Sequence, residues 1–401
     1  MLKFGVQIGT CAVLAVTSLA LASCTHDPAS AAAADEAPIV IDTTEVVRYA
    51  LGDQPRLVMG NDPAGSLFQV LGALKLSDGN IVIADGHDRE FVVVDTAGKV
   101  IRHVGRKGDG PGEFELVGRP LRAPNDQIVT LDLRLRRLTW LADTGIIRTA
   151  QLDPPTAVPQ PRAVGVLSDG SVLVTNGAFA LSASGEPRVE RDTLPVVRYG
   201  PDGQLGNRVG VFPGVEFEVR ANASNPDGPL TRSPREFGEA SGLAVVGDQL
   251  VVADNGTGNI TAFAGDGRRL RTWRLGNEPR QVTAAHIDAL RAQRLESVTD
   301  ASRRSRIASD LAERAHPRQV APAFDPRLFV DADGNLWIGS YQMPTDISQR
   351  WRQVALDGRL IGEVEVPAAF TPTDVNGRFM IGIWQDSDGV QTVRQYEMSL
   401  K

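Results

Sequence analysis

Short runs of β-branched and aliphatic residues recur along the chain, and a turn sequence follows each of them. The clearest example begins with Leu76–Asp85, continues with Arg89–Asp95 and ends with Gly98–Val104. Asp-Gly-Asn and Ala-Gly turns separate these three runs, and such turns are typical of antiparallel hairpins. The pattern therefore predicts a small antiparallel sheet in this part of the chain.

The same pattern returns along most of the sequence. A single small sheet has two faces to cover, and copies arranged around a common axis cover one another. The pattern thus predicts an all-β fold, a six-bladed β-propeller. Its further copies are Asn125–Asp132 with Arg137–Asp143, Ser168–Thr175 with Pro195–Tyr199, Gly247–Asp254 with Asn259–Phe263, Asp333–Gly339 with Trp351–Leu356, and Asn376–Ile383 with Val390–Tyr396.

The last copy lacks one outer strand before the chain reaches Lys401. Two early β-rich segments, Glu45–Tyr49 and Arg56–Met59, are candidates to supply it. We therefore expect strands from both ends of the chain to meet in the last blade and close the ring.

Two insertions interrupt the repeat, at Asn176–Thr193 and at Thr283–Ala315. The second has apolar residues at helical spacing, with Thr283 as a candidate N-cap and Pro317 as a stop signal. A break over 297–302 divides it into two helices. The sequence predicts a helical insertion over 283–316, before the fifth blade. It is either a decoration packed against the flank of a blade or a lid that binds a partner.

The N-terminal segment has the features of an export signal rather than of the fold. Residues 1–23 combine a basic start with an apolar run and small residues before Cys24. The ending Leu21-Ala22-Ser23-Cys24 resembles the lipobox of bacterial lipoproteins, which implies that Cys24 carries the lipid. Residues 24–38 are rich in Ala, Ser, Pro and Asp and predict a flexible tether, with the propeller over 39–401. The alternative is an uncleaved membrane anchor, although the apolar run is short for a spanning helix.

Composition limits the classes of partner. The 401 residues carry a formal net charge of -7, which gives no support for nucleic-acid binding because that needs a concentrated basic face. The only other cysteine, Cys11, lies in the predicted signal, so no internal disulfide is expected. We expect a protein that is lipid-anchored to the bacterial cell envelope, on its periplasmic or outer surface.

One loop carries a family resemblance. The segment Gly105–Phe114, with the sequence Gly-Arg-Lys-Gly-Asp-Gly-Pro-Gly-Glu-Phe, resembles the blade junction of NHL-repeat propellers. More narrowly, the chain resembles the bacterial six-bladed β-propeller lipoproteins. Gly210–Gly214 is a faint second copy of the loop. The resemblance implies a fold and a compartment, and the wider group contains both binding proteins and enzymes.

Candidate chemistry lies at the ends of the second strands. These strands end in polar residues that would surround one mouth of the central channel, together with their neighbours. Three of them, Asp85, Asp132 and Asp254, could hold a divalent cation such as Ca²⁺. Alternatively, Asp and Asn end these strands by bonding their own turns. The full candidate set is Asp85, His87, Arg89, Asp132, Arg134, Asn176, Asp254, Asn255, Ser340, Tyr341 and Gln385.

The sequence leaves the function open between three classes. We expect a recognition or scaffolding module that binds a protein or small-molecule ligand at the rim and requires no cofactor. The alternative is a metal-assisted hydrolase or lyase that uses an acidic site in the central channel. A third hypothesis is a structural envelope protein without a ligand. The sequence contains no His-Glu-x-x-His motif and no Gly-x-Ser-x-Gly motif that would favour a zinc enzyme or a serine hydrolase.

Overall fold

The computed structural model describes most of the chain beyond the predicted tether. The described residues are 38–41, 46–60, 67–142, 144–177, 182–183, 186–221, 228–276, 280–296, 298–313 and 317–401. All of them belong to one compact unit, Glu36–Lys401. The predicted signal peptide, Cys24 and nearly all of the predicted tether lie outside the described residues. Within the described part, neither helix has the length and apolar character that a membrane span requires.

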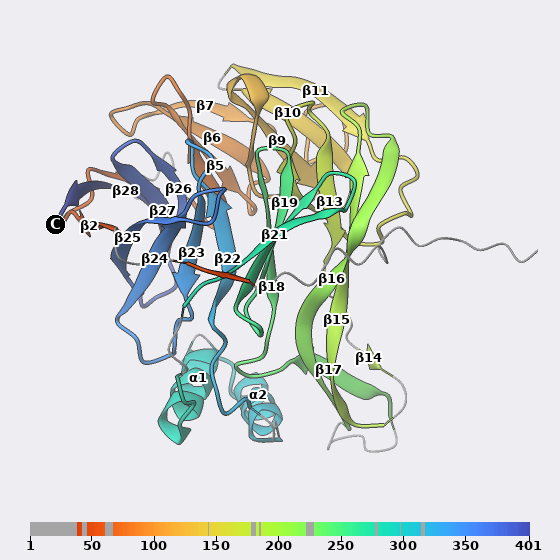
Figure 1. Cartoon of the computed structure of the whole chain (residues 1–401), viewed down its shortest axis with the longest axis vertical. Helices are drawn as coiled ribbons and strands as arrows, with labels where there is room; N and C mark the ends of the chain where they lie inside the picture. Colours follow the sequence, from red (N-terminus) through yellow and green to blue (C-terminus); the bar gives the residue numbers. More distant parts are fainter. Residues whose placement is uncertain are drawn as a thin grey trace, which may run out of the picture. The chain divides into compact units, whose positions relative to one another are not determined.

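The described chain is mainly β-structure, built of antiparallel units whose strands pair in chain order (Figure 1). The first unit consists of β4 (Val70–Lys75), β5 (Ile81–Asp85), β6 (Glu90–Val94) and β7 (Val100–Val104). The second consists of β8 (Leu121–Ala123), β9 (Gln127–Asp132), β10 (Arg137–Ala142) and β11 (Gly145–Gln151). Each forms a separate four-stranded sheet.

The third unit carries a long arm. Its strands are β12 (Pro161–Val166), β13 (Val172–Asn176), β15 (Arg188–Tyr199) and β16 (Leu205–Arg220). Beyond the sheet, β15 and β16 continue as a hairpin joined by β17 (Leu230–Pro234) and β14 (Ser182–Ala183). In this unit the sequence pattern predicted an insertion over Asn176–Thr193. The arm is larger than this predicted insertion, because it also contains the end of β16 and the strand β17. The sequence pattern did not indicate this second half, because it continues the strand pattern of β16 without a break.

The fourth unit consists of β18 (Ser241–Val246), β19 (Gln249–Asp254), β20 (Asn259–Ala264) and β21 (Arg269–Arg274), with β1 (Ile39–Val40) parallel to β21. The fifth consists of β22 (Phe324–Val330), β23 (Leu336–Ser340), β24 (Ser348–Val354) and β25 (Leu360–Pro367). The sixth contains β26 (Phe370–Asn376), β27 (Phe379–Gln385) and β28 (Gln391–Leu400).

Strands from the N-terminal part complete the last unit, as the sequence predicted. β3 (Leu57–Met59) pairs with β28 as its outer neighbour, and Met59 lies opposite Val393. β2 (Val47–Leu51) also pairs with β28, and its other edge pairs in parallel with β25. Both N-terminal candidates are therefore used, and β2 joins the fifth and sixth units into one nine-stranded sheet.

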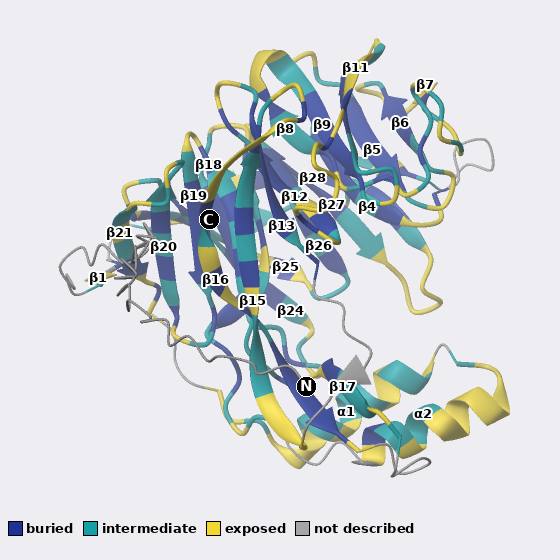
Figure 2. Ribbon diagram, turned by 90° about the vertical axis from the view of Figure 1, so that its right-hand side faces the viewer, coloured by how far each residue is buried: buried dark blue, intermediate teal, exposed yellow. Residues whose placement is uncertain are grey.

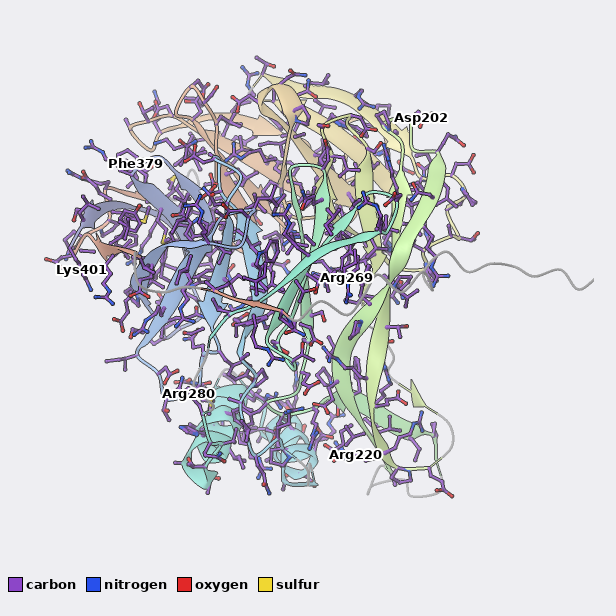
Figure 3. All side chains as sticks on the ribbon, in the orientation of Figure 1. Asp202, Arg220, Arg269, Arg280, Phe379 and Lys401 are labelled. Carbon is purple, nitrogen blue, oxygen red and sulfur yellow. The ribbon has the colours of Figure 1, made fainter. Side chains whose placement is uncertain are left out.

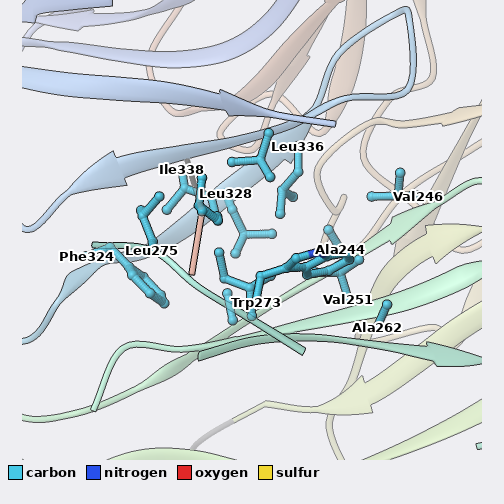
Figure 4. Packing of buried hydrophobic residues seen from close by; sticks show 14 of the residues in the cluster. Ala244, Val246, Val251, Ala262, Trp273, Leu275, Phe324, Leu328, Leu336 and Ile338 are labelled. Atoms are coloured by element: carbon cyan, nitrogen blue, oxygen red, sulfur yellow. The ribbon is translucent and has the colours of Figure 1, made fainter. Parts of the chain in front are cut away.

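Hydrophobic clusters lie between consecutive units, as in a β-propeller. In Figure 4, side chains of the fourth unit, among them Val251 and Trp273, pack against Leu336 and Ile338 of the fifth. Another cluster joins the last unit to the first, through Ile381 and Ile83. Figure 2 shows the result as dark central strands with exposed connections around them. The described sheets are thus stabilised mainly by burial between their faces.

Two helices follow β21, within the predicted insertion. α1 spans Ala284–Glu296 and α2 spans Ala301–Glu313. Both lie beside the β15–β16 arm in Figures 1 and 2. The Thr283 hydroxyl accepts the His286 backbone N–H at 3.4 Å, which makes Thr283 the predicted N-cap, and Asp300 caps α2 through the Arg303 N–H at 2.6 Å. α1 has no buried residue, so side-chain contacts at its surface decide how it is held.

Candidate functional site

The aspartates that end β5 and β9 bind their own connections. The Asp85 carboxylate accepts backbone N–H groups of Phe68 at 3.1 Å and His87 at 2.8 Å. Asp132 accepts four backbone N–H groups, including those of Glu115 at 2.7 Å and Leu135 at 2.8 Å. Both side chains are almost fully buried. Each carboxylate connects the loop before the first strand of its unit to the end of the second strand, and it also binds the turn that follows. The second contact is the alternative given in the sequence analysis, in which Asp and Asn bind their own turns.

Two asparagines have the same function in other units. The Asn176 side chain accepts the Gln160 N–H at 2.9 Å, and Asn255 accepts the Ala240 N–H at 2.7 Å. Asn255 also donates to the Phe324 carbonyl at 3.1 Å. In the fourth unit the connecting residue is therefore Asn255, which leaves the carboxylate of Asp254 available for ion pairing.

The remaining predicted rim residues divide between the surface and a cavity. Arg89 and Arg134 lie 3.3 and 3.7 Å from the Glu115 carboxylate. The His87 ring lies against the ring of Phe68, with 5.0 Å between centroids. Ser340 bonds within its own sheet, and Gln385 is exposed. Tyr341 is the one predicted residue that lines the cavity described below.

The three aspartates do not fit a metal site. Asp85 and Asp132 use their oxygens on backbone N–H groups, and Asp254 pairs with Arg191 at 2.6 Å. A Ca²⁺ site needs several oxygens directed at one point. In the described ranges, no three His, Cys, Asp or Glu side chains gather closely enough to hold a metal ion. The structure thus does not bring Asp85, Asp132 and Asp254 together as the sequence led us to expect, because Asp85 and Asp132 accept backbone N–H groups beside their strand ends and Asp254 pairs with Arg191.

A cavity of about 730 Å³ lies where α1, the base of the β15–β16 arm and the ends of several sheets meet. One wall comes from β16, β17 and the loop before β18, and another comes from α1. The rest comes from the start of β22 and from the loops after β23 and β25. Among the lining residues are Glu216, Arg235, Phe237, Glu239, Leu290, Arg294, Asp325, Arg327, Tyr341, Met343 and Asp346.

A continuous series of ion pairs supports the arm side of the cavity. Arg191 of β15 lies 2.6 Å from Asp254 and 3.0 Å from Glu239. Beyond Glu239, Arg318 leads to Glu216, which Arg235 approaches to 2.9 Å. Such partly buried pairs contribute little net stability, but they hold planar groups in fixed positions. The full series is Asp254, Arg191, Glu239, Arg318, Glu216 and Arg235.

A glycine makes room for this series. A Cβ placed on Gly256 would lie 2.2 Å from the carboxyl carbon of Glu239. Any other residue would push Glu239 away from Arg191 and Arg318. Asp254, Asn255 and Gly256 thus form one turn in which each residue has a separate structural function.

The helix side of the cavity is held by a buried glutamate. The side chain of Glu236 is only 1% exposed, and its oxygens lie 3.2 Å from Arg294 and 3.7 Å from Arg291 of α1. Next to it, Phe237 has a left-handed backbone (φ 55°) and packs with Ala321 and Met343. A non-glycine residue in this conformation is strained and is held by its surroundings. This backbone conformation lets Phe237 pack with Ala321 and Met343 while Glu236, the residue before it, contacts α1.

The opposite wall combines a tyrosine with two further ion pairs. Burial raises the pKa of Tyr341 to about 12, and the nearby Asp325 adds to that rise. Tyr341 therefore keeps its proton and acts as a hydrogen-bond donor. Arg327 donates to Asp325 at 2.6 and 2.9 Å and thereby has a raised pKa.

Arg280, marked beside α1 in Figure 3, donates to both oxygens of Asp346 at 2.7 Å. Its guanidinium lowers the pKa of Asp346. The pair ties the segment that leads into α1 to the loop after β23. Charge pairing thus holds this loop, which has no regular backbone structure of its own.

Most of the cavity was outside the reach of the sequence pattern. Glu216, Arg235 and Glu239 lie in a segment without a repeat, so the repeat pattern predicted no role for them. One signal was present, since Glu216 and Glu218 interrupt the otherwise apolar run Val215–Val219. Both glutamates are buried in the structure. A buried charge in a strand needs an oppositely charged partner, so these two glutamates were the sequence signal for the ion-pair series.

No protein-family model matches the chain, and none of the curated proteins compared with it matches either. Among solved structures, the chain is similar to a member of the DUF4221 family from Bacteroides vulgatus, at 10% identity and a TM-score of 0.49, over 88% of this chain and 99% of that one. It is also similar to virginiamycin B lyase from Staphylococcus aureus, at 11% identity and 0.41, over 88% and 100%. A gluconolactonase from Xanthomonas campestris is 14% identical, with a TM-score of 0.42, over 83% and 87%. At these values the likenesses assign no activity to the chain.

Proposed function

We propose that the chain is a six-bladed β-propeller that serves as a recognition module and binds its ligand in the cavity beside α1. The six antiparallel units and the clusters between them support the blade count. In this proposal β2 and β3 close the ring, and the helical insertion precedes the fifth blade. The resemblance of Gly105–Phe114 to NHL-repeat junctions agrees with this arrangement.

The cavity is the observation that carries the proposal. Its volume of about 730 Å³ lies within the range of small-molecule sites, roughly 300–1,000 Å³. Its walls come from segments far apart in the chain, and ion pairs hold their polar groups in place. Binding sites of this kind lose little entropy when a ligand arrives, because the groups are already ordered. Small molecules and the ends of longer chains fit this space, and a folded partner would have to insert a loop.

The proposal includes attachment to the cell envelope. The sequence ending at Cys24 supports a lipid on that residue, which would place the propeller on the periplasmic or outer surface. A recognition module held at a membrane meets ligands of the envelope at high local concentration. We do not extend the proposal to metal-assisted hydrolysis, because two of the aspartates that it needed, Asp85 and Asp132, bind backbone N–H groups and the third, Asp254, pairs with Arg191.

The test fills the cavity. Ala369 lines it between β25 and β26, so Ala369→Trp should occupy the space that a ligand would take. The purified chain is screened by thermal shift against sugars, nucleotides, amino acids, short peptides and fatty acids. We expect at least one class to raise the unfolding midpoint of the natural chain but not that of Ala369→Trp.

The matched control is Ala97→Trp, which adds the same side chain at an exposed turn of the first unit. Every compound that binds the natural chain should bind this variant equally. If compounds bind Ala369→Trp as well as the natural chain, or if no class binds at all, the cavity is not the recognition site.

A further inference from the structure

We propose that the cavity takes an uncharged, polyhydroxylated ligand, a neutral saccharide chain, and this inference rests on the proposed function. It deepens that proposal by naming the ligand class from the lining groups. Three features of the lining carry it: its charges are already paired, its polar groups are planar, and one hydroxyl has no partner.

Every charged residue of the described lining has an opposite charge beside it. Glu216 and Arg235 pair with each other, as do Asp325 and Arg327. The remaining three pair with residues behind the wall: Glu239 with Arg191 and Arg318, Arg294 with Glu236, and Asp346 with Arg280. A charged ligand would have to break one of these pairs and leave its partner uncompensated, which is costly away from water. The lining therefore favours a ligand without net charge.

The polar lining consists of planar groups that together supply both donors and acceptors. Among the described residues, carboxylate, guanidinium and amide side chains line the cavity, the last from Gln293 and Gln342, and no lysine, serine, threonine or histidine does. A paired arginine and carboxylate present N–H donors and oxygen acceptors side by side. Two neighbouring hydroxyls of a sugar ring are each donor and acceptor, so they match such a pair without changing its charge.

Tyr341 supplies a donor that nothing else uses. In the described part of the chain its hydroxyl makes no hydrogen bond, although Tyr341 lines the cavity together with Asp325 and Arg294. A tyrosine hydroxyl with an apolar ring behind it commonly finds a partner when it is covered. Leu290, Met343 and Pro344 add apolar surface on which the C–H faces of a sugar ring can rest.

The experiment compares probes that differ in charge. Chitohexaose is uncharged, whereas its fully deacetylated form has the same length and carries ammonium groups. Cellohexaose, hexagalacturonate and an end-blocked hexapeptide of alanine, serine and glycine complete the set. Titration calorimetry of the full chain should show that at least one neutral hexasaccharide binds about tenfold or more tightly than the charged ones.

Two variants place the binding in the cavity. Tyr341→Phe removes one hydroxyl and should weaken the neutral saccharide about three- to tenfold, as the loss of one hydrogen bond predicts. Tyr49→Phe, in β2, is the control and should leave the affinity unchanged. Ala369→Trp should abolish the binding.

The outcomes separate this inference from the proposed function. Equal or tighter binding of a charged hexasaccharide overturns the inference, and so does the absence of binding by every neutral one. If the hexapeptide alone binds and Ala369→Trp abolishes that binding, the saccharide inference fails while the recognition site stands. If a saccharide binds Ala369→Trp and Tyr341→Phe as tightly as it binds the natural chain, it binds outside the cavity, and both proposals lose their site.

Discussion

Single polar residues at strand ends have clear structural functions in this protein. Asp85, Asp132, Asn176 and Asn255 each accept backbone N–H groups from the loop that precedes their own sheet. The repeat pattern located these positions correctly. It could not identify their partners, because Phe68 and Glu115 are contacted through loops whose conformation no strand periodicity specifies. A residue type that suits a ligand thus also suits a turn, and only the partner distinguishes the two.

The Gly105–Phe114 loop gives a stability prediction at this scale. Gly105 has φ 94°, and a Cβ on it would lie 2.5 Å from the ring of Phe114, which is fully buried. We expect Gly105→Ala to lower the free energy of unfolding by about 2–4 kcal/mol, from backbone strain together with overpacking. Urea unfolding measures the change.

Gly247→Ala is the matched control, because Gly247 has φ 57° and no atom within 4 Å of the added Cβ. It should cost only about 1 kcal/mol, from the backbone alone. Equal losses in the two variants would mean that the Phe114 contact adds nothing.

At the scale of elements, regular strands were predictable and their extensions were not. The runs at Leu76–Asp85 and Gly247–Asp254 contain β5 and β19 in the structure. They were predictable because short β-rich segments bounded by tight turns are typical of strands. The first strands of the units, such as β4 and β12, contain glycine or polar residues and carried no signal. The arm of β15 and β16 was only half recognised, since its second half, the end of β16 with β17, belongs to no copy of the repeat. The cavity could not be predicted for the same reason, because the arm and α1 form two of its walls.

Helix α1 gives a prediction about local stability. It has no buried residue, and the buried carboxylate of Glu236 contacts two of its arginines, Arg291 and Arg294. Glu236→Ala should therefore release the helix, and we expect amide hydrogen exchange over 284–296 to become about tenfold faster or more while the central strands keep their protection. Exchange monitored by mass spectrometry separates the two regions.

Asp288→Ala provides the comparison on the same helix, since Asp288 is exposed and contributes no ion pair among the described residues. Its exchange should stay close to that of the natural chain. A loss of protection in β5 and β19 as well as in α1 would show that Glu236 supports the whole fold instead of the helix.

For the whole molecule, the repeat allowed the sheet architecture to be predicted from the sequence. Aliphatic strand pairs such as Ile81–Asp85 with Glu90–Val94 leave both faces of a sheet apolar, and another sheet must cover each face. The pairing of β3 with β28 was also predictable, because the last copy lacked a strand. The cavity was not, since it depends on insertions that the repeat does not describe.

Attachment to the envelope is a whole-molecule prediction. Cys24→Ser removes the residue proposed to carry the lipid, so the protein should move from the membrane fraction to the soluble fraction of the envelope, and its mass should lack the diacyl group. Cys11→Ser, within the predicted signal, should leave both unchanged. Retention of Cys24→Ser in the membrane fraction would favour the uncleaved anchor instead.

The pairing of β2 and β3 with β28 determines when the molecule can be finished. The ribosome makes Val47–Leu51 and Leu57–Met59 early and Gln391–Leu400 last, yet these strands are neighbours. The sheets of the first three units contain only strands that are close in sequence, whereas this one cannot be completed until the end of synthesis and has the entropy cost of closing a very long loop. In a nascent chain the edges of β2 and β3 that pair with β28 therefore stay unpaired until synthesis ends, and in any truncated product that lacks β28 they stay unpaired permanently.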